Sequence, residues 1–212
     1  MKILYLHGFA SGPLSKKGVE LDKHLTAKGH QVERLNLRVP SFEHLRLSAM
    51  LDTVRAAIDR VGAPVVLIGS SLGGLTAARV AERDPRVVAC VLLAPAFQLV
   101  ARWQQQLGTE WDTWRERGTR EVADYTTGGM STVDFGFVED VARIDVGYPD
   151  VRVPTLVMHG IHDEVVPVDR ARTFAAGRSN VRLLELPDGH ELVASIPTLL
   201  AESEAFLARV AS

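Results

Sequence analysis

A serine stands in a glycine-rich turn between an apolar run and a helical pattern. Residues 69–73 read Gly-Ser-Ser-Leu-Gly and directly follow the apolar run 65–68. A G-x-S-x-G motif at a strand-to-helix turn is typical of a nucleophile elbow, in which the serine has a strained backbone and an exposed hydroxyl. Glycines are needed on either side because helix and strand approach closely. Ser71 fits this frame, whereas Ser70 does not, because Ile68 stands where a glycine would be required.

A serine hydroxyl needs an adjacent base, and the base needs an orienting acid. Two polar turns follow later apolar runs, at residues 159–167 and 187–191. Both are expected at the carboxyl ends of parallel strands, where open α/β sheets place their sites. In enzymes with this elbow the acid and the histidine follow the serine in that order. The sequence therefore predicts Asp163 as the acid and His190 as the base for Ser71.

Three other carboxylates compete with Asp163. Glu164 is adjacent and should point away if Asp163 points inward. Asp145 lies at the end of a long insertion, where some hydrolases place their acid. Asp169 is expected to cap the N-terminus of the next helix.

Six other histidines compete with His190. The strand-end residues His159 and His162 are expected to shape their loop by hydrogen bonding, and His7 is expected to brace the loop after the first strand. The others fall in helical or turn surroundings and are expected to face solvent: His24, His30 and His44.

A tetrahedral intermediate needs two preorganised donors for its oxyanion. The backbone amide of Leu72 is one, because the elbow places it at the start of the following helix. The other is expected from the loop at residues 7–13, where Gly8 lets the backbone approach the site; the amide of Phe9 is the candidate.

The composition argues against several other functions. The 24 Lys and Arg residues nearly balance the 26 Asp and Glu residues, giving a net charge of −2, so there is no basic footprint for nucleic acid. Cys90, the only cysteine, lies in an apolar run and is expected to be a buried structural thiol. The histidines lack metal-ligand spacing and no phosphate-binding loop is present, so neither a metal nor a cofactor is expected.

No membrane segment is expected. The apolar run that opens the chain has four residues, too short for a secretory signal. No later stretch approaches the roughly 20 apolar residues of a membrane span. We therefore expect a cytoplasmic protein without a membrane span.

Short aliphatic runs alternate with helical patterns. The runs lie at residues 3–6, 32–37, 65–68, 87–93, 155–158 and 181–186. This alternation predicts a mostly parallel six-stranded sheet with helices on both faces. The run 32–37 alternates apolar and polar residues, as an edge strand does, whereas 65–68 is apolar throughout and should be central. Helices are predicted over residues 17–28, 42–61 and 169–176, each followed by a glycine that suits a C-cap.

Residues 97–149 interrupt this rhythm. They contain all three tryptophans and show no clear strand, so a helical cap that folds over the sheet is expected. Its aromatic residues either line a substrate pocket or attach the cap to the body, and residues 128–129 are interpreted as a flexible joint. The whole chain, 1–212, is expected to be one domain with this insertion.

Four motifs together span nearly the whole chain. They are residues 4–9 followed by Ser11, Pro13, Ser15 and Lys16; residues 69–74; residues 163–165; and residues 189–190. On these motifs the sequence resembles the small α/β-hydrolases of the YqiA/YcfP-like esterase group. The resemblance implies an α/β-hydrolase fold without its first two antiparallel strands. It also implies serine hydrolase activity on esters or thioesters, carried by Ser71, Asp163 and His190. The sequence of the Trp-rich insertion does not match this group.

The residues and the resemblance together predict a carboxylic ester hydrolase that forms an acyl-enzyme with a small-molecule ester. A thioesterase, a peptidase or a carbon–carbon bond hydrolase would use the same triad. A binding module that has lost catalysis is an alternative of another class. The substrate-binding residues and the oligomeric state are left open.

Overall fold

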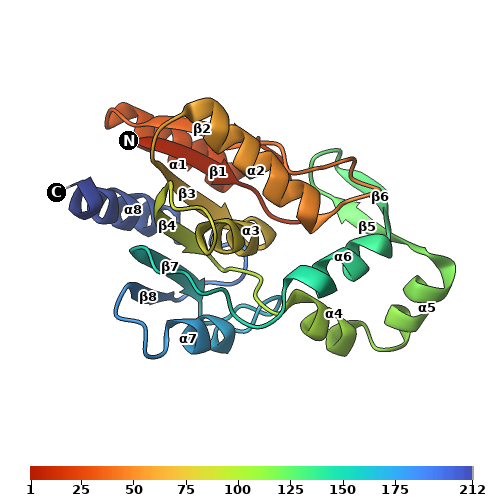
Figure 1. Ribbon diagram of the computed structural model, residues 1–212. Coiled ribbons are helices and arrows are strands. Elements are labelled where there is room, and N and C mark those ends of the chain that lie inside the picture. Colours follow the sequence, from red (N-terminus) through yellow and green to blue (C-terminus); the bar gives the residue numbers. More distant parts are fainter. Residues whose placement is uncertain (212) are drawn as a thin grey trace.

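The structure, a computed structural model that describes residues 1–211, contains one six-stranded sheet with the order β2-β1-β3-β4-β7-β8 (Figure 1). The strands are β1 (Lys2–Leu6), β2 (Gln31–Leu35), β3 (Val65–Ser70), β4 (Val87–Leu93), β7 (Thr155–Gly160) and β8 (Val181–Leu186). Each neighbouring pair is parallel. The predicted parallel sheet is confirmed, with β2 at an edge and β3 inside.

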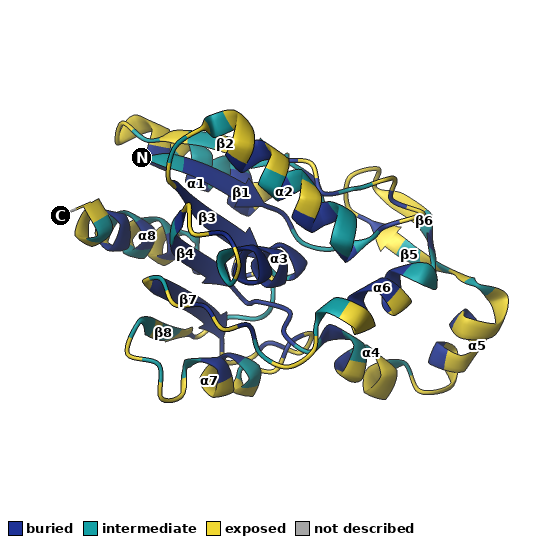
Figure 2. Ribbon diagram, in the orientation of Figure 1, coloured by how far each residue is buried: buried dark blue, intermediate teal, exposed yellow. Residues whose placement is uncertain are grey.

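Helices cover both faces of the sheet, as predicted. Successive residues of a strand point to opposite faces, so Leu4 and Leu6 enter one core cluster while Ile3 and Tyr5 enter the other. The first cluster includes residues of α2 (Leu47–Val61), α3 (Leu72–Ala81) and α7 (Asp169–Ala175). The second includes residues of α1 (Lys16–Ala27) and α8 (Ile196–Ala211). Figure 2 shows the inner strands β1, β3, β4 and β7 buried and the helices exposed on their outer sides.

The glycines that were expected to follow three helices are present there with left-handed backbone conformations. Gly29, Gly62 and Gly177 have φ of 83°, 62° and 72°. The prediction that the second helix begins at residue 42 was wrong, because α2 begins at Leu47. The residues before it form a turn, in which the Arg46 amide donates to the Val39 carbonyl at 3.1 Å.

The expected capping role of Asp169 was also wrong. Asp169 is the first residue of α7, after the N-cap Val168. Its carboxylate accepts a hydrogen bond from Arg172 Nη1 at 2.9 Å.

The insertion is mainly helical, as predicted, but it also contains an antiparallel hairpin. Its elements are α4 (Leu99–Leu107), α5 (Thr109–Arg117), β5 (Thr119–Asp124), β6 (Gly129–Asp134) and α6 (Gly136–Ile144). The interpretation of residues 128–129 as a joint is corrected, because they lie at the hairpin turn, where Gly128 has φ 73°. Figure 1 shows these elements grouped at the end of the sheet opposite both chain termini. We refer to residues 97–149 as the cap.

Two of the three tryptophans hold the cap together. Trp111 and Trp114 are 6% and 1% exposed. The Trp114 indole donates to the Val133 carbonyl at 3.1 Å, and both rings pack edge-on against Phe135. These side chains therefore attach α5 to the hairpin and to Phe135, the residue that precedes α6.

A buried ion pair fixes the hairpin to the body. Arg38, which follows β2, donates from Nη1 and Nη2 to the Asp124 carboxylate at 3.0 and 2.7 Å. The carboxylate also accepts from Ser131 Oγ at 2.9 Å and is itself 1% exposed. The hydrogen bonds from Arg38 outweigh burial and hold the pKa of Asp124 well below its usual 3.8. No helix of residues 1–211 is long and apolar enough to span a membrane.

We expect Asp124→Asn to lower the free energy of unfolding by about 3 kcal/mol at neutral pH, because it leaves Arg38 without its buried partner. The pKa of Asp124 is depressed in the folded state, so this contribution is present above the unfolded pKa of about 4 and is lost as the pH falls towards the folded value. Urea unfolding of both proteins between pH 7 and pH 3 measures the difference.

Asp112→Asn is the control, because Asp112 pairs with Arg115 on the exposed surface of α5. Exposed pairs contribute about 0–1 kcal/mol. Equal losses of stability in the two variants would contradict the anchoring role of Asp124.

Candidate active site

Ser71 lies between β3 and α3 in a strained backbone conformation. Its φ is 53° and its ψ is −115°, a region that side chains with a Cβ rarely adopt. Its amide donates to the Leu93 carbonyl at 2.8 Å, and its carbonyl accepts from the Ala96 amide at 3.0 Å. The turn is thus a nucleophile elbow in geometry as well as in sequence.

The flanking glycines are required by close backbone contacts. A Cβ on Gly69 would stand 2.2 Å from the Gly73 carbonyl oxygen, and a Cβ on Gly73 would stand 2.1 Å from the Leu6 carbonyl oxygen. Both distances are far below van der Waals contact. The spacing of the motif therefore reflects two places where α3 meets β3 and β1 without room for a side chain.

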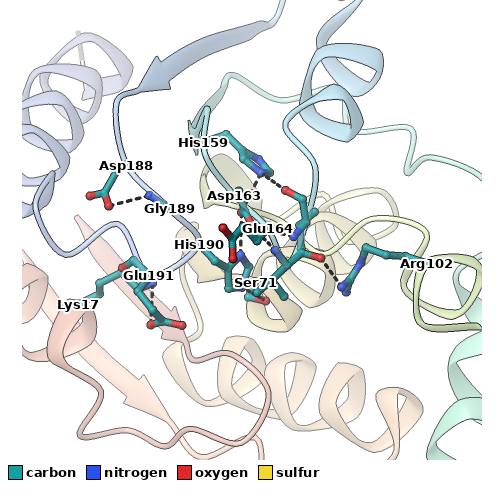
Figure 3. A network of polar contacts seen from close by, with 12 residues as sticks. Lys17, Ser71, Arg102, His159, Asp163, Glu164, Asp188, Gly189, His190 and Glu191 are labelled. Carbon is teal, nitrogen blue, oxygen red and sulfur yellow. Dashed lines mark hydrogen bonds and ion pairs between the residues drawn. The ribbon is translucent and has the colours of Figure 1, made fainter. Parts of the chain in front are cut away.

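Ser71, His190 and Asp163 come together at the carboxyl ends of β3, β8 and β7 (Figure 3). His190 Nε2 lies 3.0 Å from Ser71 Oγ. His190 Nδ1 lies 2.7 Å from Asp163 Oδ2. With the proton on Nδ1, Nε2 is free to accept the serine proton.

The environment of Asp163 keeps it ionised. Its Oδ1 accepts from the amides of Val165 and Val166 at 2.9 and 2.6 Å. The buried His159 holds its Nε2 3.1 Å from Asp163 Oδ2. Burial alone would raise the pKa of Asp163, but the hydrogen bonds from His159 and His190 outweigh it and hold the pKa well below 3.8.

The loops that carry the acid and the base are fastened to each other. The His162 amide donates to the Asp188 carbonyl at 3.0 Å. A Cβ on Gly160 would stand 2.3 Å from the same carbonyl oxygen. The Asp188 carboxylate accepts from the amides of Gly189 and Ser195 at 2.8 and 2.9 Å, which fixes the turn before His190.

The two candidate oxyanion donors belong to segments that adjoin Ser71. Leu72 is the first residue of α3, so its amide has no partner within the helix. The loop that carries Phe9 lies against the serine, because a Cβ on Gly8 would stand 3.3 Å from Ser71 Cβ. No backbone hydrogen bond within residues 1–211 uses either amide.

His7 braces this loop, as expected. Its Nε2 accepts from the Leu37 amide at 3.0 Å, and its Nδ1 lies 2.9 Å from the Gly8 carbonyl, to which it donates. Burial lowers the pKa of His7 and so favours the neutral ring that this arrangement requires.

A cavity of about 800 Å³ opens above Ser71 and His190, between the cap and the body. Trp103 and Tyr125 line it, so the aromatic residues of the cap include some that line a cavity and others that attach the cap. The Trp103 ring packs edge-on against Phe9, 5.1 Å between centroids.

The competing groups are engaged elsewhere. Asp145 lies 3.0 Å from Arg79 Nη2 and accepts from the Leu99 amide. Glu164 is exposed, and His24 and His44 are paired with Glu204 and Asp134. His159 also donates to the Val166 carbonyl at 2.8 Å, which confirms its loop-shaping role.

Two other expectations concern the thiol and metal ions. Cys90 is fully buried, as predicted, and burial raises the pKa of its thiol to about 12. Residues 1–211 hold no cluster of three or more His, Cys, Asp or Glu side chains arranged for a metal ion.

Sequence reasoning missed two buried cations in the cavity wall, Arg102 of α4 and Lys17 of α1. Neither belongs to a motif, and each lies in a helix, where a basic residue is usually exposed. Only the placement of the cap over the sheet brings them to one cavity.

Comparison with known proteins matches residues 2–201 to the uncharacterised protein family UPF0227. No curated protein matches the chain in sequence. Among solved structures, alpha/beta hydrolase domain-containing protein 10 from mouse is similar, with a TM-score of 0.83 and 22% identity over 99% of this chain and 90% of that one. Est1E from Butyrivibrio proteoclasticus, with ferulic acid bound, has a TM-score of 0.83 and 22% identity over 98% and 88%. Paleococcus ferrophilus monoacylglycerol lipase has a TM-score of 0.71 and 17% identity over 94% of each chain. These similarities show the α/β-hydrolase fold.

We expect Gly73→Ala to lower the free energy of unfolding by more than about 2 kcal/mol, because the added methyl group collides with backbone rather than with a flexible side chain. Gly129→Ala is the control, because a Cβ there meets only Thr127 Oγ1 at 3.9 Å. Urea unfolding of the two variants measures both changes. A Gly73→Ala protein as stable as Gly129→Ala would show that α3 can move away from β1 at little cost.

Proposed function

The chain belongs to the uncharacterised protein family UPF0227 and has the α/β-hydrolase fold, and from this premise we propose that it is a serine hydrolase that cleaves carboxylic esters of small molecules. One observation carries the proposal. The Ser71 hydroxyl, the His190 ring and the Asp163 carboxylate form a continuous relay of 3.0 and 2.7 Å beside a cavity.

In the proposed acylation step, Ser71 Oγ attacks the ester carbonyl carbon while His190 Nε2 accepts the hydroxyl proton. Asp163 remains a carboxylate and stabilises the imidazolium. Its depressed pKa supports this role, because the acid stays ionised wherever the histidine can act as a base. When the tetrahedral intermediate collapses, His190 gives its proton to the departing alcohol.

The oxyanion of the intermediate is proposed to lie between the amides of Leu72 and Phe9. The N-terminus of α3 adds a favourable dipole there. In the second step His190 takes a proton from water while the water oxygen attacks the acyl-enzyme carbonyl carbon. When this intermediate collapses, the bond to Ser71 Oγ breaks, His190 returns the proton to Ser71 Oγ, and the carboxylic acid is released. Each of these donors and acceptors comes from the elbow or from a strand-end loop.

The cavity supports a small or medium-sized substrate, because pockets for ligands of that size occupy roughly 300–1,000 Å³ and this one is about 800 Å³. Its wall includes the apolar side chains of Phe9, Leu72, Leu99 and Trp103. Such a wall suits an acyl or alkyl chain. The lipase and the ferulic acid complex among the structural neighbours are consistent with this choice.

We expect hydrolysis of p-nitrophenyl esters, from acetate to palmitate, to fall at least about 10⁴-fold in Ser71→Ala, because the nucleophile is lost. Labelling with a fluorophosphonate, mapped by mass spectrometry, should place the label on Ser71 in the wild-type protein. A folded wild-type protein with neither turnover nor label would overturn the proposal and favour a binding module.

Asp163→Asn should lower kcat by about 10⁴-fold, because the asparagine holds His190 in the wrong tautomer. The neighbouring Glu164→Gln is the matched control and should change kcat less than about twofold, because its carboxylate is exposed and outside the relay. Steady-state kinetics with one ester compares them. A similar loss of kcat in both variants would show that Asp163 is not the acid that orients His190.

A further inference from the structure

Arg102 is a buried cation in the wall of the cavity. It projects from α4 of the cap, is 4% exposed, and lines the same cavity as Ser71 and His190. Figure 3 shows it reaching towards the loop that carries Asp163 and Glu164.

The guanidinium has hydrogen-bond donors to spare. Its Nη1 donates to the Val165 carbonyl at 2.5 Å and to Gln106 Oε1 at 3.2 Å. Its Nε is buried without a partner, and no carboxylate among residues 1–211 forms an ion pair with the group. A buried charge without a counterion is costly, so proteins usually supply one.

The nearest carboxylates are already committed. Asp145 is paired with Arg79, and Asp163 is held by His159 and His190. The positive charge of Arg102 therefore faces the cavity without a counterion of its own.

The cavity wall as a whole carries more positive than negative side chains. The described residues that line the cavity include three cations but only one carboxylate, that of Glu191. The cations are Lys16, Lys17 and Arg102. Lys17 Nζ is held by the Glu191 carbonyl at 2.8 Å and lies 3.7 Å from Glu191 Oε2. A concave site lined mainly by one sign of charge attracts ligands of the opposite sign.

We propose that Arg102 binds a carboxylate carried by the substrate, so that the preferred substrates are esters with both an apolar chain and a carboxylate. This inference rests on the proposed esterase function and names its substrate class. A guanidinium with free N–H groups suits a carboxylate because it can form charge-assisted hydrogen bonds to both oxygens.

The test compares monoesters of dicarboxylic acids with neutral esters of equal chain length. The probes are p-nitrophenyl hydrogen adipate and suberate against p-nitrophenyl hexanoate and octanoate. In the wild-type protein we expect kcat/KM to favour a carboxylate ester by about 10-fold or more, and in Arg102→Gln we expect this preference to fall towards 1. A wild-type protein without the preference, or an Arg102→Gln protein that keeps it, would overturn the inference.

Two controls separate charge recognition from a structural role. Arg115→Gln removes an exposed arginine of the cap, paired with Asp112, and should leave both the activity and the preference unchanged. Gln106→Ala removes another contact between α4 and the Val165 carbonyl, together with one acceptor of Arg102, and should retain the preference, because the guanidinium remains and keeps its own hydrogen bond to that carbonyl. If Gln106→Ala lost the preference as fully as Arg102→Gln, the contact of α4 with the loop would explain it and the inference would fail.

A binding measurement keeps this inference distinct from the proposed function. Calorimetry with Ser71→Ala should show monomethyl adipate or monomethyl suberate, which carry one free carboxylate, binding about 10-fold more tightly than the neutral methyl hexanoate or methyl octanoate, a difference lost in Ser71→Ala/Arg102→Gln. Arg102-dependent binding in a protein that cleaves no ester would support the anion site and refute the esterase. Cleavage of esters with neither a kinetic nor a binding preference for the carboxylate would support the esterase and refute the anion site.

Discussion

The close approach of α3 to β1 and β3 is the constraint on which the rest of the site depends. Because Gly73 rests on the Leu6 carbonyl, the first turn of α3 stands directly beside the loop that follows β1. That contact brings the start of α3, which carries the Leu72 amide, close to the loop that carries Phe9. The strain of the Ser71 backbone is offset by its hydrogen bonds to Leu93 and Ala96.

The cap is positioned by directional polar contacts as much as by apolar packing. Asp124 binds Arg38 and Asp134 binds Arg46, each across the boundary between cap and body. Asp140 accepts from the amide and the hydroxyl of Ser48 at the start of α2. Hydrogen bonds depend on angle as well as distance, so these carboxylates determine where the cap sits as well as how tightly it is held. The shape of the cavity, whose wall belongs partly to the cap, follows from them.

The sequence could predict the sheet because each buried parallel strand is a short apolar run, whatever lies around it. It could predict the arrangement of Ser71, Asp163 and His190 because the carboxyl ends of parallel strands meet at one edge of the sheet. The hairpin was missed because the only two apolar residues of β5, Val122 and Ala123, are adjacent, so its sequence lacks the apolar–polar alternation that marks a half-buried strand. The start of α2 was misplaced because a turn with few local signals precedes it. The cavity cations were missed because their burial depends on where the cap folds.

The contacts of Val165 join the proposed recognition of the substrate to the proposed chemistry. Its carbonyl accepts from Arg102, and its amide donates to Asp163. One residue therefore sets the guanidinium of the cap relative to the acid of the relay, and through His190 relative to Ser71. A carboxylate bound by Arg102 would be held at a position fixed with respect to the nucleophile. Such positioning lowers the entropic barrier to attack, because the ester is already oriented when the hydroxyl reacts. In this arrangement the loop after β7 serves both selectivity and rate, which gives a physical reason for its dense hydrogen bonding.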